Sequence, residues 1–226
     1  MDRPCNLVIC PTTLTYNWKN EIEKFFDGVN VCVVESTPSE REYQLSPECM
    51  ANYDIVIINY EKVKKTLPLL MQKHFFYIVL DEAHKIKNAK SIITQSVKQL
   101  KGKRKLALSG TPLQNRVAEL WSLFDFLMPN FLEEESVFNK TYNKYLTGNI
   151  KKMSENLEET QSFVNALRSL KRRIAPFILR RTKEQVLKEL PPKVIQDYPC
   201  TMPAFQAKVH EEVEKQFPFA SNVHQK

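Results

Sequence analysis

Glycine is scarce in this chain of 226 residues, which contains only Gly28, Gly102, Gly110 and Gly148. Average proteins contain roughly 7% glycine, several times more than this chain. A Walker A phosphate loop needs two glycines five positions apart followed by Lys and Ser or Thr, and a dinucleotide loop needs three glycines in close order. Because the nearest pair, Gly102 and Gly110, is eight positions apart, the sequence contains neither phosphate-binding loop.

Zinc-binding and membrane-spanning patterns are also missing. The five cysteines form no Cys-x-x-Cys pair and the four histidines are scattered, which argues against a zinc module and a disulfide framework. We therefore expect reduced thiols in an intracellular protein. No apolar run approaches 18 residues and no apolar segment follows residues 1–4, so we expect neither a membrane span nor a secretory signal.

The net charge of +7 is distributed unevenly along the chain. Residues 83–118 contain nine Lys or Arg and no acid, and residues 168–183 contain seven more, again without an acid. Together these segments carry +16, so the remainder of the chain carries −9. Such segregation favours basic faces that bind phosphate, although solvated helix faces that bind nothing explain the charge equally well.

The first half of the chain alternates between strand and helix patterns. Short apolar runs rich in β-branched residues occur at residues 7–10, 31–34, 55–58, 76–80 and 106–108. They are continuous, which is typical of parallel strands buried on both faces. Helical patterns separate them, for example over residues 15–26 and 91–100. This alternation predicts an α/β open sheet with right-handed crossovers.

From residue 113 onward the pattern is mainly helical. We expect helices over residues 117–128, 136–146, 157–174 and 180–190, then a strand over 194–198 and a helix over 205–217. The strand and helix near the end indicate that a second unit begins there.

The strongest chemical feature is an apolar strand that delivers Asp81 and Glu82 at its carboxyl end. Ligands of open α/β sheets bind at this edge. Asp81 could hold Mg²⁺ through water, because hard cations prefer carboxylate oxygen, and Glu82 could orient a water that attacks a γ-phosphate. The alternative is an ordinary strand end with two exposed acids. His84 taken alone is more typical of a surface or capping histidine.

A second feature joins the apolar run at 106–108 to the turn Ser109-Gly110-Thr111-Pro112. Gly110 permits an unusual backbone, and Pro112 suits the first turn of a helix. Small hydroxyls beside the acids of a neighbouring strand could couple nucleotide state to a moving element. Taken singly, Ser109 and Thr111 are more simply explained as helix-capping hydroxyls.

A third feature is the pair Thr12 and Thr13, which lies between the first strand and the helix that contains Trp18. Backbone N–H groups and hydroxyls at this position suit a nucleic-acid phosphate. A plain helix cap explains the two threonines equally well.

In this order and spacing, these segments resemble the Swi/Snf-type ATPases of helicase superfamily two. The matching segments are 7–14 with Trp18 (motif Ia), 54–61 (motif Ib), 81–88 (motif II, a DEAH-type box), 108–115 (motif III), the helical insertion, and 176–183. The resemblance covers nearly all of residues 7–217. Residues 120–129 and 190–198 are most similar to the subfamily that strips TATA-binding protein from promoter DNA.

The resemblance implies a RecA-like α/β fold of the P-loop NTPase type, here without its P-loop strand, followed by a helical insertion and the beginning of a second lobe. The first ATPase lobe would span residues 1–128, the helical protrusion and brace 129–190, and the start of lobe two 191–226. ATP and Mg²⁺ would be the cofactors of translocation along double-stranded DNA without strand separation. TATA-binding protein or another DNA-bound protein would be the partner in transcription regulation or chromatin remodelling in the nucleus, with no membrane involved.

The resemblance also implies roles for individual residues. Asp81 would hold Mg²⁺ and Glu82 would activate the attacking water. The other roles are coupling of ATP state to DNA grip (His84, Ser109, Thr111, Gln114), contact with the DNA backbone (Thr12, Thr13, Lys85, Lys87) and the brace between the two lobes (Arg180, Arg181).

Two parts of the family pattern are not in these 226 residues. Motif I, the Gly-rich loop with Lys-Thr, would precede Leu7, and motifs IV to VI with their arginine finger would follow residue 226. We therefore expect a translocase fragment that is not catalytically competent alone, with a marginal sheet edge where the P-loop strand would pair.

Two other hypotheses compete with the enzyme fragment. One is a degenerate paralogue that binds DNA or a protein without catalysis, and the other is a DEAH-type RNA helicase, which fits residues 108–115 and the long helical insertion less well. The presence of Asp81, Glu82 and His84 together favours the enzyme fragment, because a binding module needs none of them.

Overall fold

The computed structural model describes residues 4–110, 117–147, 157–187, 189, 196 and 198–216. The chain divides into two units, Met1–Arg173 and Ile174–Lys226, each of which is considered by itself. The domain limits at residues 128 and 190 stay predictions. Within the described residues, no helix is both long and apolar enough to cross a membrane.

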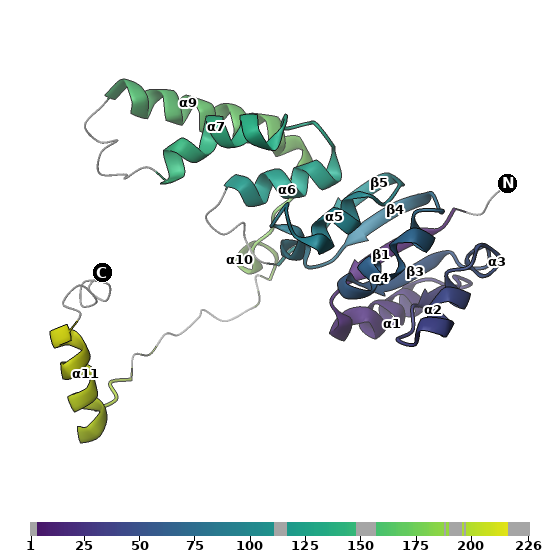
Figure 1. The fold of residues 1–226 in the computed structure, drawn as a ribbon, viewed down its shortest axis with the longest axis horizontal. Coiled ribbons are helices and arrows are strands. Elements are labelled where there is room, and N and C mark those ends of the chain that lie inside the picture. The colour runs from purple at the N-terminus through teal and green to yellow at the C-terminus, as the bar shows by residue number, and fades with distance from the viewer. Residues whose placement is uncertain are drawn as a thin grey trace. The chain divides into compact units, whose positions relative to one another are not determined.

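The first unit is built on a sheet of five parallel strands in the order β2-β3-β1-β4-β5 (Figure 1). The strands are β1 Asn6–Cys10, β2 Val31–Val33, β3 Ile55–Asn59, β4 Phe75–Leu80 and β5 Gly102–Ala107. Strand β1 is central, and its Leu7 pairs with Val56 of β3 on one side and Ile78 of β4 on the other. The predicted parallel α/β sheet is therefore confirmed.

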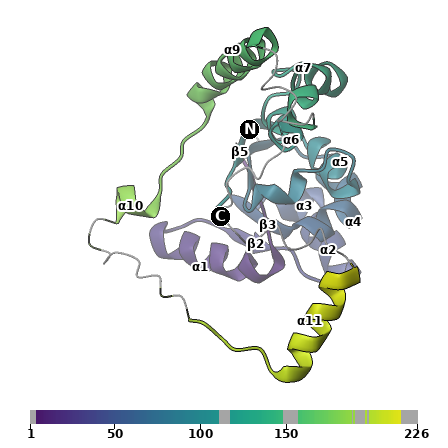
Figure 2. The ribbon, with the colours of Figure 1, turned by 90° about the vertical axis from the view of Figure 1, so that its left-hand side faces the viewer.

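Alternate residues of each strand point to opposite faces of the sheet and bury two apolar clusters. Leu7 and Ile9 belong to the larger cluster, which also includes residues of α4, α5 and α6. Val8 and Cys10 belong to the smaller cluster, against which Trp18 of α1 packs. Figures 1 and 2 show α1 on the side of the sheet away from α4 and α5.

The described helices of the first unit follow the chain in this order: η1 Thr12–Leu14, α1 Thr15–Phe25, α2 Pro38–Gln44, α3 Pro47–Met50, α4 Tyr60–Leu70, η2 Ala83–Ile86, α5 Ile92–Lys98, α6 Val117–Leu127, α7 Glu135–Thr147 and α9 Leu157–Ile174, whose last residue opens the second unit. The helices predicted at 15–26, 91–100, 117–128, 136–146 and 157–174 are confirmed to within two residues. Helices α2, α3 and α4 were not predicted. Asn59 caps α4 by accepting the Lys62 backbone N–H at 2.9 Å.

Strand β5 begins four residues earlier than the apolar run predicts, because its first four residues are Gly-Lys-Arg-Lys. Charged side chains are tolerated there because β5 is an edge strand, paired only with β4 among the described residues. Beside this edge, Tyr77 and Leu106 are exposed on the sheet face that α1 covers elsewhere. The structure therefore has an open edge at β5 with apolar surface next to it.

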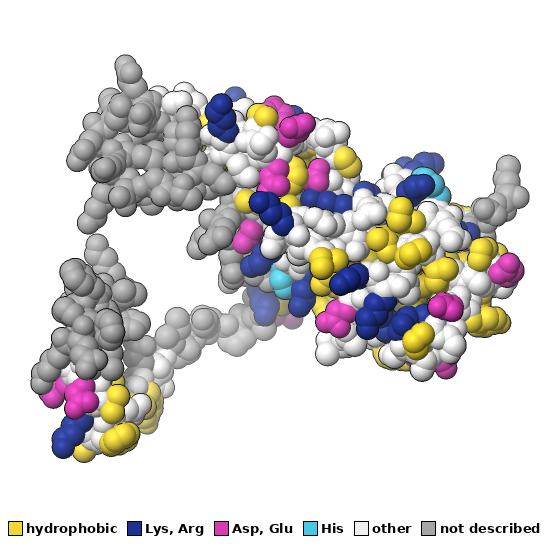
Figure 3. Space-filling view, in the orientation of Figure 1, with side chains coloured by type: hydrophobic (Ala, Val, Ile, Leu, Met, Phe, Trp, Pro, Cys, Tyr) yellow, Lys and Arg dark blue, Asp and Glu magenta, His cyan; other side chains and the backbone are white. Residues whose placement is uncertain are grey.

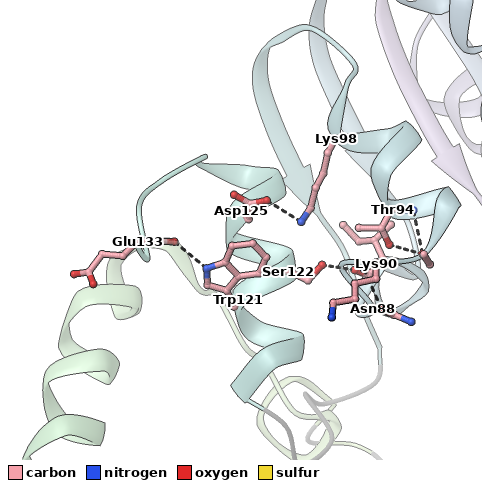
Figure 4. A network of polar contacts seen from close by, with 10 residues as sticks. Asn88, Lys90, Thr94, Lys98, Trp121, Ser122, Asp125 and Glu133 are labelled. Carbon is pink, nitrogen blue, oxygen red and sulfur yellow. Dashed lines mark hydrogen bonds and ion pairs between the residues drawn. The ribbon is translucent and has the colours of Figure 1, made fainter. Parts of the chain in front are cut away.

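Helix α6 is attached to α5 through a cluster of polar and aromatic side chains (Figure 4). Lys98 of α5 forms an ion pair with Asp125 at 2.8 Å, and its Nζ lies 4.8 Å from the centre of the Trp121 ring. The Trp121 indole donates to the Glu133 carbonyl at 3.0 Å. These contacts join the helical segment to the sheet-bearing part of the first unit.

A second attachment connects α6 to the turn that follows the acidic strand end. The Ser122 hydroxyl donates to the Ile86 carbonyl of η2 at 2.7 Å, and both residues are fully buried (Figure 4). Nearby, Lys87 forms a longer ion pair with Glu119 at 3.7 Å. The helical segment is thus bonded directly to the stretch containing Asp81 to His84.

The second unit contains η3 Ala175–Phe177, α10 Lys183–Val186 and α11 Ala204–Gln216. The helix predicted over 180–190 begins only at Lys183, because Thr182 takes the N-cap position and its N–H donates to the Gln185 side chain at 3.1 Å. Most of the predicted strand 194–198 lies outside the described residues. The helix predicted at 205–217 is confirmed as α11.

Candidate functional site

The acidic end of β4 is held by strands on both sides. The Asp81 backbone N–H donates to the Ile9 carbonyl of β1 at 2.8 Å, and the Ala83 N–H donates to the Leu108 carbonyl beyond β5 at 2.8 Å. These bonds extend the parallel ladders past the end of β4. The two acids therefore project from a rigid backbone at the carboxyl edge of the sheet.

The carboxylate of Asp81 accepts two hydrogen bonds from the protein. The Trp18 indole Nε1–H donates to Oδ2 at 2.8 Å, and the backbone N–H of Glu82 donates to Oδ1 at 2.9 Å. In addition, the hydroxyl of the buried Tyr60 donates to the Asp81 backbone carbonyl at 2.7 Å. Side chain and main chain of Asp81 are thus both fixed.

Glu82 adopts a left-handed backbone, with φ 50° and ψ 51°, which is uncommon for a residue with a side chain. Its carboxylate Oε2 lies 3.1 Å from the Nδ1 of His84, and both side chains are partly exposed. Within a single turn, this geometry places the acid and the imidazole together at the surface. The coupling role implied for His84 stays a prediction.

The negative charge at Asp81 affects two buried groups beside it. Burial and, second, the Asp81 charge raise the pKa of Cys10 to about 12. The same two causes, in the same order, raise the pKa of the Tyr60 hydroxyl far above its usual value. Both groups are therefore neutral at physiological pH.

The arrangement suits a hydrated Mg²⁺ shared with phosphate oxygens. A carboxylate has about four lone-pair positions, and the indole and the Glu82 N–H occupy two of those on Asp81. The described residues contain no group of three or more His, Cys, Asp or Glu that could hold a metal ion alone. Mg²⁺ is usually held by one or two carboxylates, waters and phosphates, so the donor set present fits that ion.

The threonines predicted to contact a phosphate backbone lie in η1, at the carboxyl end of β1. Thr12 and Thr13 are both exposed, and neither caps the following helix, because the N-cap of α1 is Leu14. The turn is fixed to α1 by a hydrogen bond from the Thr15 hydroxyl to the Thr12 carbonyl at 3.0 Å. The helix-cap explanation of the two threonines is therefore wrong.

The predicted DNA-contact lysines differ in their surroundings. Lys85 and Lys87 are both exposed, and Lys87 forms an ion pair with Glu119 at 3.7 Å. On the face shown in Figure 3, Lys and Arg side chains lie in several groups separated by apolar and uncharged surface. Contact of these lysines with DNA stays a prediction.

The motif around Gly110 reaches the acids. A Cβ built on Gly110 would lie 3.9 Å from the Glu82 Oε1, so the turn after β5 runs beside the Glu82 carboxylate. Ser109 of the same turn is exposed. Thr111 and Gln114, the other predicted coupling residues, lie outside the described residues. The structure thus brings Gly110 and Glu82 together and leaves the coupling roles as predictions.

Arg180 and Arg181 belong to the second unit, where both are exposed and Arg181 donates to the Arg180 carbonyl at 3.1 Å. Their role in a brace between lobes stays a prediction.

Sequence reasoning missed the two residues that hold Asp81 in place. Trp18 and Tyr60 were considered only as parts of matching motifs, although each has a polar atom that needs a partner when its ring is buried. A signal was present, because Trp18 lies about one helical turn after η1 and Tyr60 directly follows β3. Both therefore lie near the carboxyl edge of the sheet, where Asp81 also lies.

Comparisons with known proteins agree with this architecture. The model of the SNF2-related domain matches residues 3–225. The TATA-binding protein-associated factor BTAF1 of Arabidopsis thaliana is 42% identical over 207 residues, which is 92% of this chain and 10% of that protein. The TATA-binding protein-associated factor MOT1 of Saccharomyces cerevisiae is 39% identical over 210 residues, 93% of this chain and 11% of that protein.

A solved structure shares the fold. The Sulfolobus solfataricus SWI2/SNF2 ATPase core in complex with dsDNA has a TM-score of 0.67 and 33% identity, covering 96% of this chain and 42% of that chain. The chain thus spans about a tenth of the length of the curated relatives and less than half of the solved core. The predicted resemblance and the RecA-like fold are confirmed, and the chain belongs to the SNF2-related domain family of ATPases.

Proposed function

We propose that this chain is the acid-bearing part of the first lobe of an ATP-driven duplex-DNA translocase that moves a DNA-bound protein in the nucleus. The observation that carries the proposal is the placement of Asp81 and Glu82 at the carboxyl edge of a parallel sheet, beside the turn at Gly110. The relatives are TATA-binding protein-associated factors, which supports TATA-binding protein, or another protein bound to DNA, as the substrate that is moved.

The chemistry follows from the two carboxylates. Mg²⁺, when bound, would neutralise charge on the phosphates of ATP. Asp81, fixed by two hydrogen bonds, would accept hydrogen bonds from the water shell of that ion. Glu82 would orient the attacking water. His84, whose Nδ1 lies 3.1 Å from Oε2 of Glu82, would fix the orientation of that carboxylate.

The open edge of β5 supports the need for a further strand. Neither phosphate loop occurs in the 226 residues, so the phosphate-binding amides must be supplied by other residues. Among the described residues strand β5 pairs only with β4, and Tyr77 and Leu106 expose apolar surface near its other edge. We propose that a parallel strand carrying the P-loop pairs with β5, and that the helix after that loop covers Tyr77 and Leu106.

Binding to DNA is tested by titrating salt against the affinity of a fluorescent duplex. Contacts to the phosphate backbone make log K fall linearly with log salt, with a slope of about −0.9 per neutralised phosphate. We expect Lys85→Ala to make this slope shallower by about 0.9, the contribution of one phosphate contact. The matched control is Lys64→Ala, which removes one exposed positive charge from α4, at a residue outside the proposed DNA contacts. No binding at low salt, or equal effects of both variants, contradicts the proposed contact.

Catalytic competence is tested by phosphate release from residues 1–226 with and without duplex DNA. We expect no measurable DNA-stimulated turnover, because loss of an arginine finger alone costs about 10³–10⁵ in rate and the phosphate loop is also missing. The control is Glu82→Gln, which keeps the shape of the side chain and removes its charge. Turnover above that control would show that the 226 residues hydrolyse ATP unaided.

A further inference from the structure

Trp18 forms a hydrogen bond to the acid of another element. Its indole N–H lies 2.8 Å from Oδ2 of Asp81, a residue 63 positions away in the sequence. This distance is typical of a hydrogen bond whose acceptor is charged. An indole N–H can only donate and a carboxylate oxygen can only accept, so the two groups are complementary partners.

The indole ring is itself held by packing. Trp18 is half-buried and lies against the apolar cluster of Val8, Cys10, Ile22 and Ile57 on the α1 face of the sheet. A ring packed on a sheet has few alternative rotamers, so the direction of its N–H is set by the fold. The orientation of one Asp81 oxygen is therefore determined by α1.

A second aromatic residue holds Asp81 from the other face. Tyr60, which belongs to the larger apolar cluster, donates to the Asp81 backbone carbonyl at 2.7 Å. The main chain of Asp81 is thus anchored by Tyr60, whereas its side chain is anchored by Trp18. Movement of α1 relative to the sheet would turn the carboxylate without displacing the backbone.

Helix α1 also carries the turn that the sequence predicts to contact phosphate. Within this turn the Leu14 N–H donates to the Pro11 carbonyl at 2.9 Å, and the Thr15 hydroxyl ties Thr12 to the first turn of α1. Trp18 follows Thr15 by three residues, about one helical turn. From Thr12 to Asp81 the connection consists of two side-chain hydrogen bonds and one turn of helix.

We propose that Trp18 is a positioning residue for Asp81, and that it transmits contact at the turn Pro11–Leu14 to the carboxylate. The transmission rests on the proposed DNA contact of Thr12 and Thr13, whereas the positioning of Asp81 does not. Trp18 acts through Asp81 and touches neither reactant.

The positioning is tested by nuclear magnetic resonance of the complete chain with ¹⁵N-labelled tryptophan. The chain has two tryptophans, so two indole N–H signals are expected, assigned with Trp18→Phe and Trp121→Phe. If one of these variants does not fold, the other suffices for the assignment. We expect Asp81→Asn to move the Trp18 signal upfield. We also expect the indole proton to exchange with solvent roughly tenfold faster, which corresponds to the lower end of the free energy of a hydrogen bond to a charged group.

The matched control is Asp125→Asn. Asp125 is the carboxylate of the Lys98 cluster around Trp121, so the same substitution there removes an acid near the other indole. It should leave the Trp18 signal and its exchange rate unchanged. A Trp18 signal that responds equally to both substitutions, or to neither, overturns the positioning role.

The transmission is tested by adding duplex DNA to the same labelled chain while fluorescence anisotropy of the duplex reports binding independently. We expect the Trp18 signal to shift on binding, and the shift to be lost in the double variant Thr12→Val/Thr13→Val. A bound duplex with an unmoved Trp18 signal overturns the transmission and leaves the proposed function intact. Absence of binding contradicts the proposed DNA contact and overturns the transmission with it, and the Asp81→Asn comparison still decides the positioning.

Discussion

Replacing Ser122 with alanine should destabilise the first unit measurably. The Ser122 hydroxyl donates to the Ile86 carbonyl at 2.7 Å, and both residues are completely buried. The substitution removes the donor and leaves a buried carbonyl short of a partner, which costs about 1–3 kcal/mol. The higher helix propensity of alanine offsets a few tenths of a kcal/mol of this destabilisation. We therefore expect the free energy of unfolding to fall by about 1–2.5 kcal/mol.

A urea titration followed by circular dichroism measures this change, together with a melting temperature lowered by roughly 2–8 °C for a unit of this size. The matched control is Ser96→Ala. Ser96 is also buried in a helix, and its hydroxyl donates to the Ile92 carbonyl at 2.8 Å. That carbonyl lies within α5 and also accepts a backbone N–H of the helix, so it keeps a hydrogen-bond partner when the hydroxyl is removed. Equal midpoints for the two variants would refute the assignment of stabilising energy to the bond between α6 and η2.

Three further perturbations have defined outcomes. Gly102→Ala should cost about 1–3 kcal/mol in a urea titration, because its Cβ would lie 2.8 Å from two atoms of the fully buried Ile78. An unchanged midpoint would show that Ile78 moves freely. The unfolding free energy should decrease as pH rises above 9, because burial raises the pKa of Cys32 to about 11 and the folded chain then binds more protons than the unfolded one. Cys32→Ala should reduce the steepness of that pH dependence by at most about 1.4 kcal/mol per pH unit. The same pH dependence in the variant and the parent chain would contradict burial of the Cys32 thiol as its cause. Asp125→Asn should destabilise by about 1 kcal/mol, whereas Glu23→Gln, in the more exposed pair of α1, should stay within about 0.5 kcal/mol, both measured by thermal unfolding.

The parallel sheet and its acidic edge were predictable because their determinants are local. Continuous apolar runs mark strands buried on both faces, and the carboxyl end of such a strand lies where open sheets bind ligands. The run from Phe75 to Leu80 therefore gave the position of Asp81 and Glu82 without knowledge of any other contact. Only the last two residues of strand β5 were predicted, because an edge strand tolerates the charges of Lys103 to Lys105, which conceal it from a search for apolar runs.

The bonds that fix the site were not predictable because they join residues distant in sequence. Trp18 and Asp81 are 63 positions apart, and Ser122 and Ile86 are 36 apart. A hydropathy pattern treats an indole as apolar surface, so it finds the packed ring and gives no partner for its N–H. The partner is determined only when the strand order places α1 beside the end of β4.

The left-handed backbone of Glu82 strains the turn that follows β4. A side chain in this region of φ and ψ costs of order 1–2 kcal/mol relative to glycine. Glycine would occupy the same turn without that strain, so a chain under pressure for stability alone would be better served by Glu82→Gly. The carboxylate is therefore held against the folding free energy of its own turn. At this residue the proposed role of the carboxylate and the stability of the turn therefore favour different side chains.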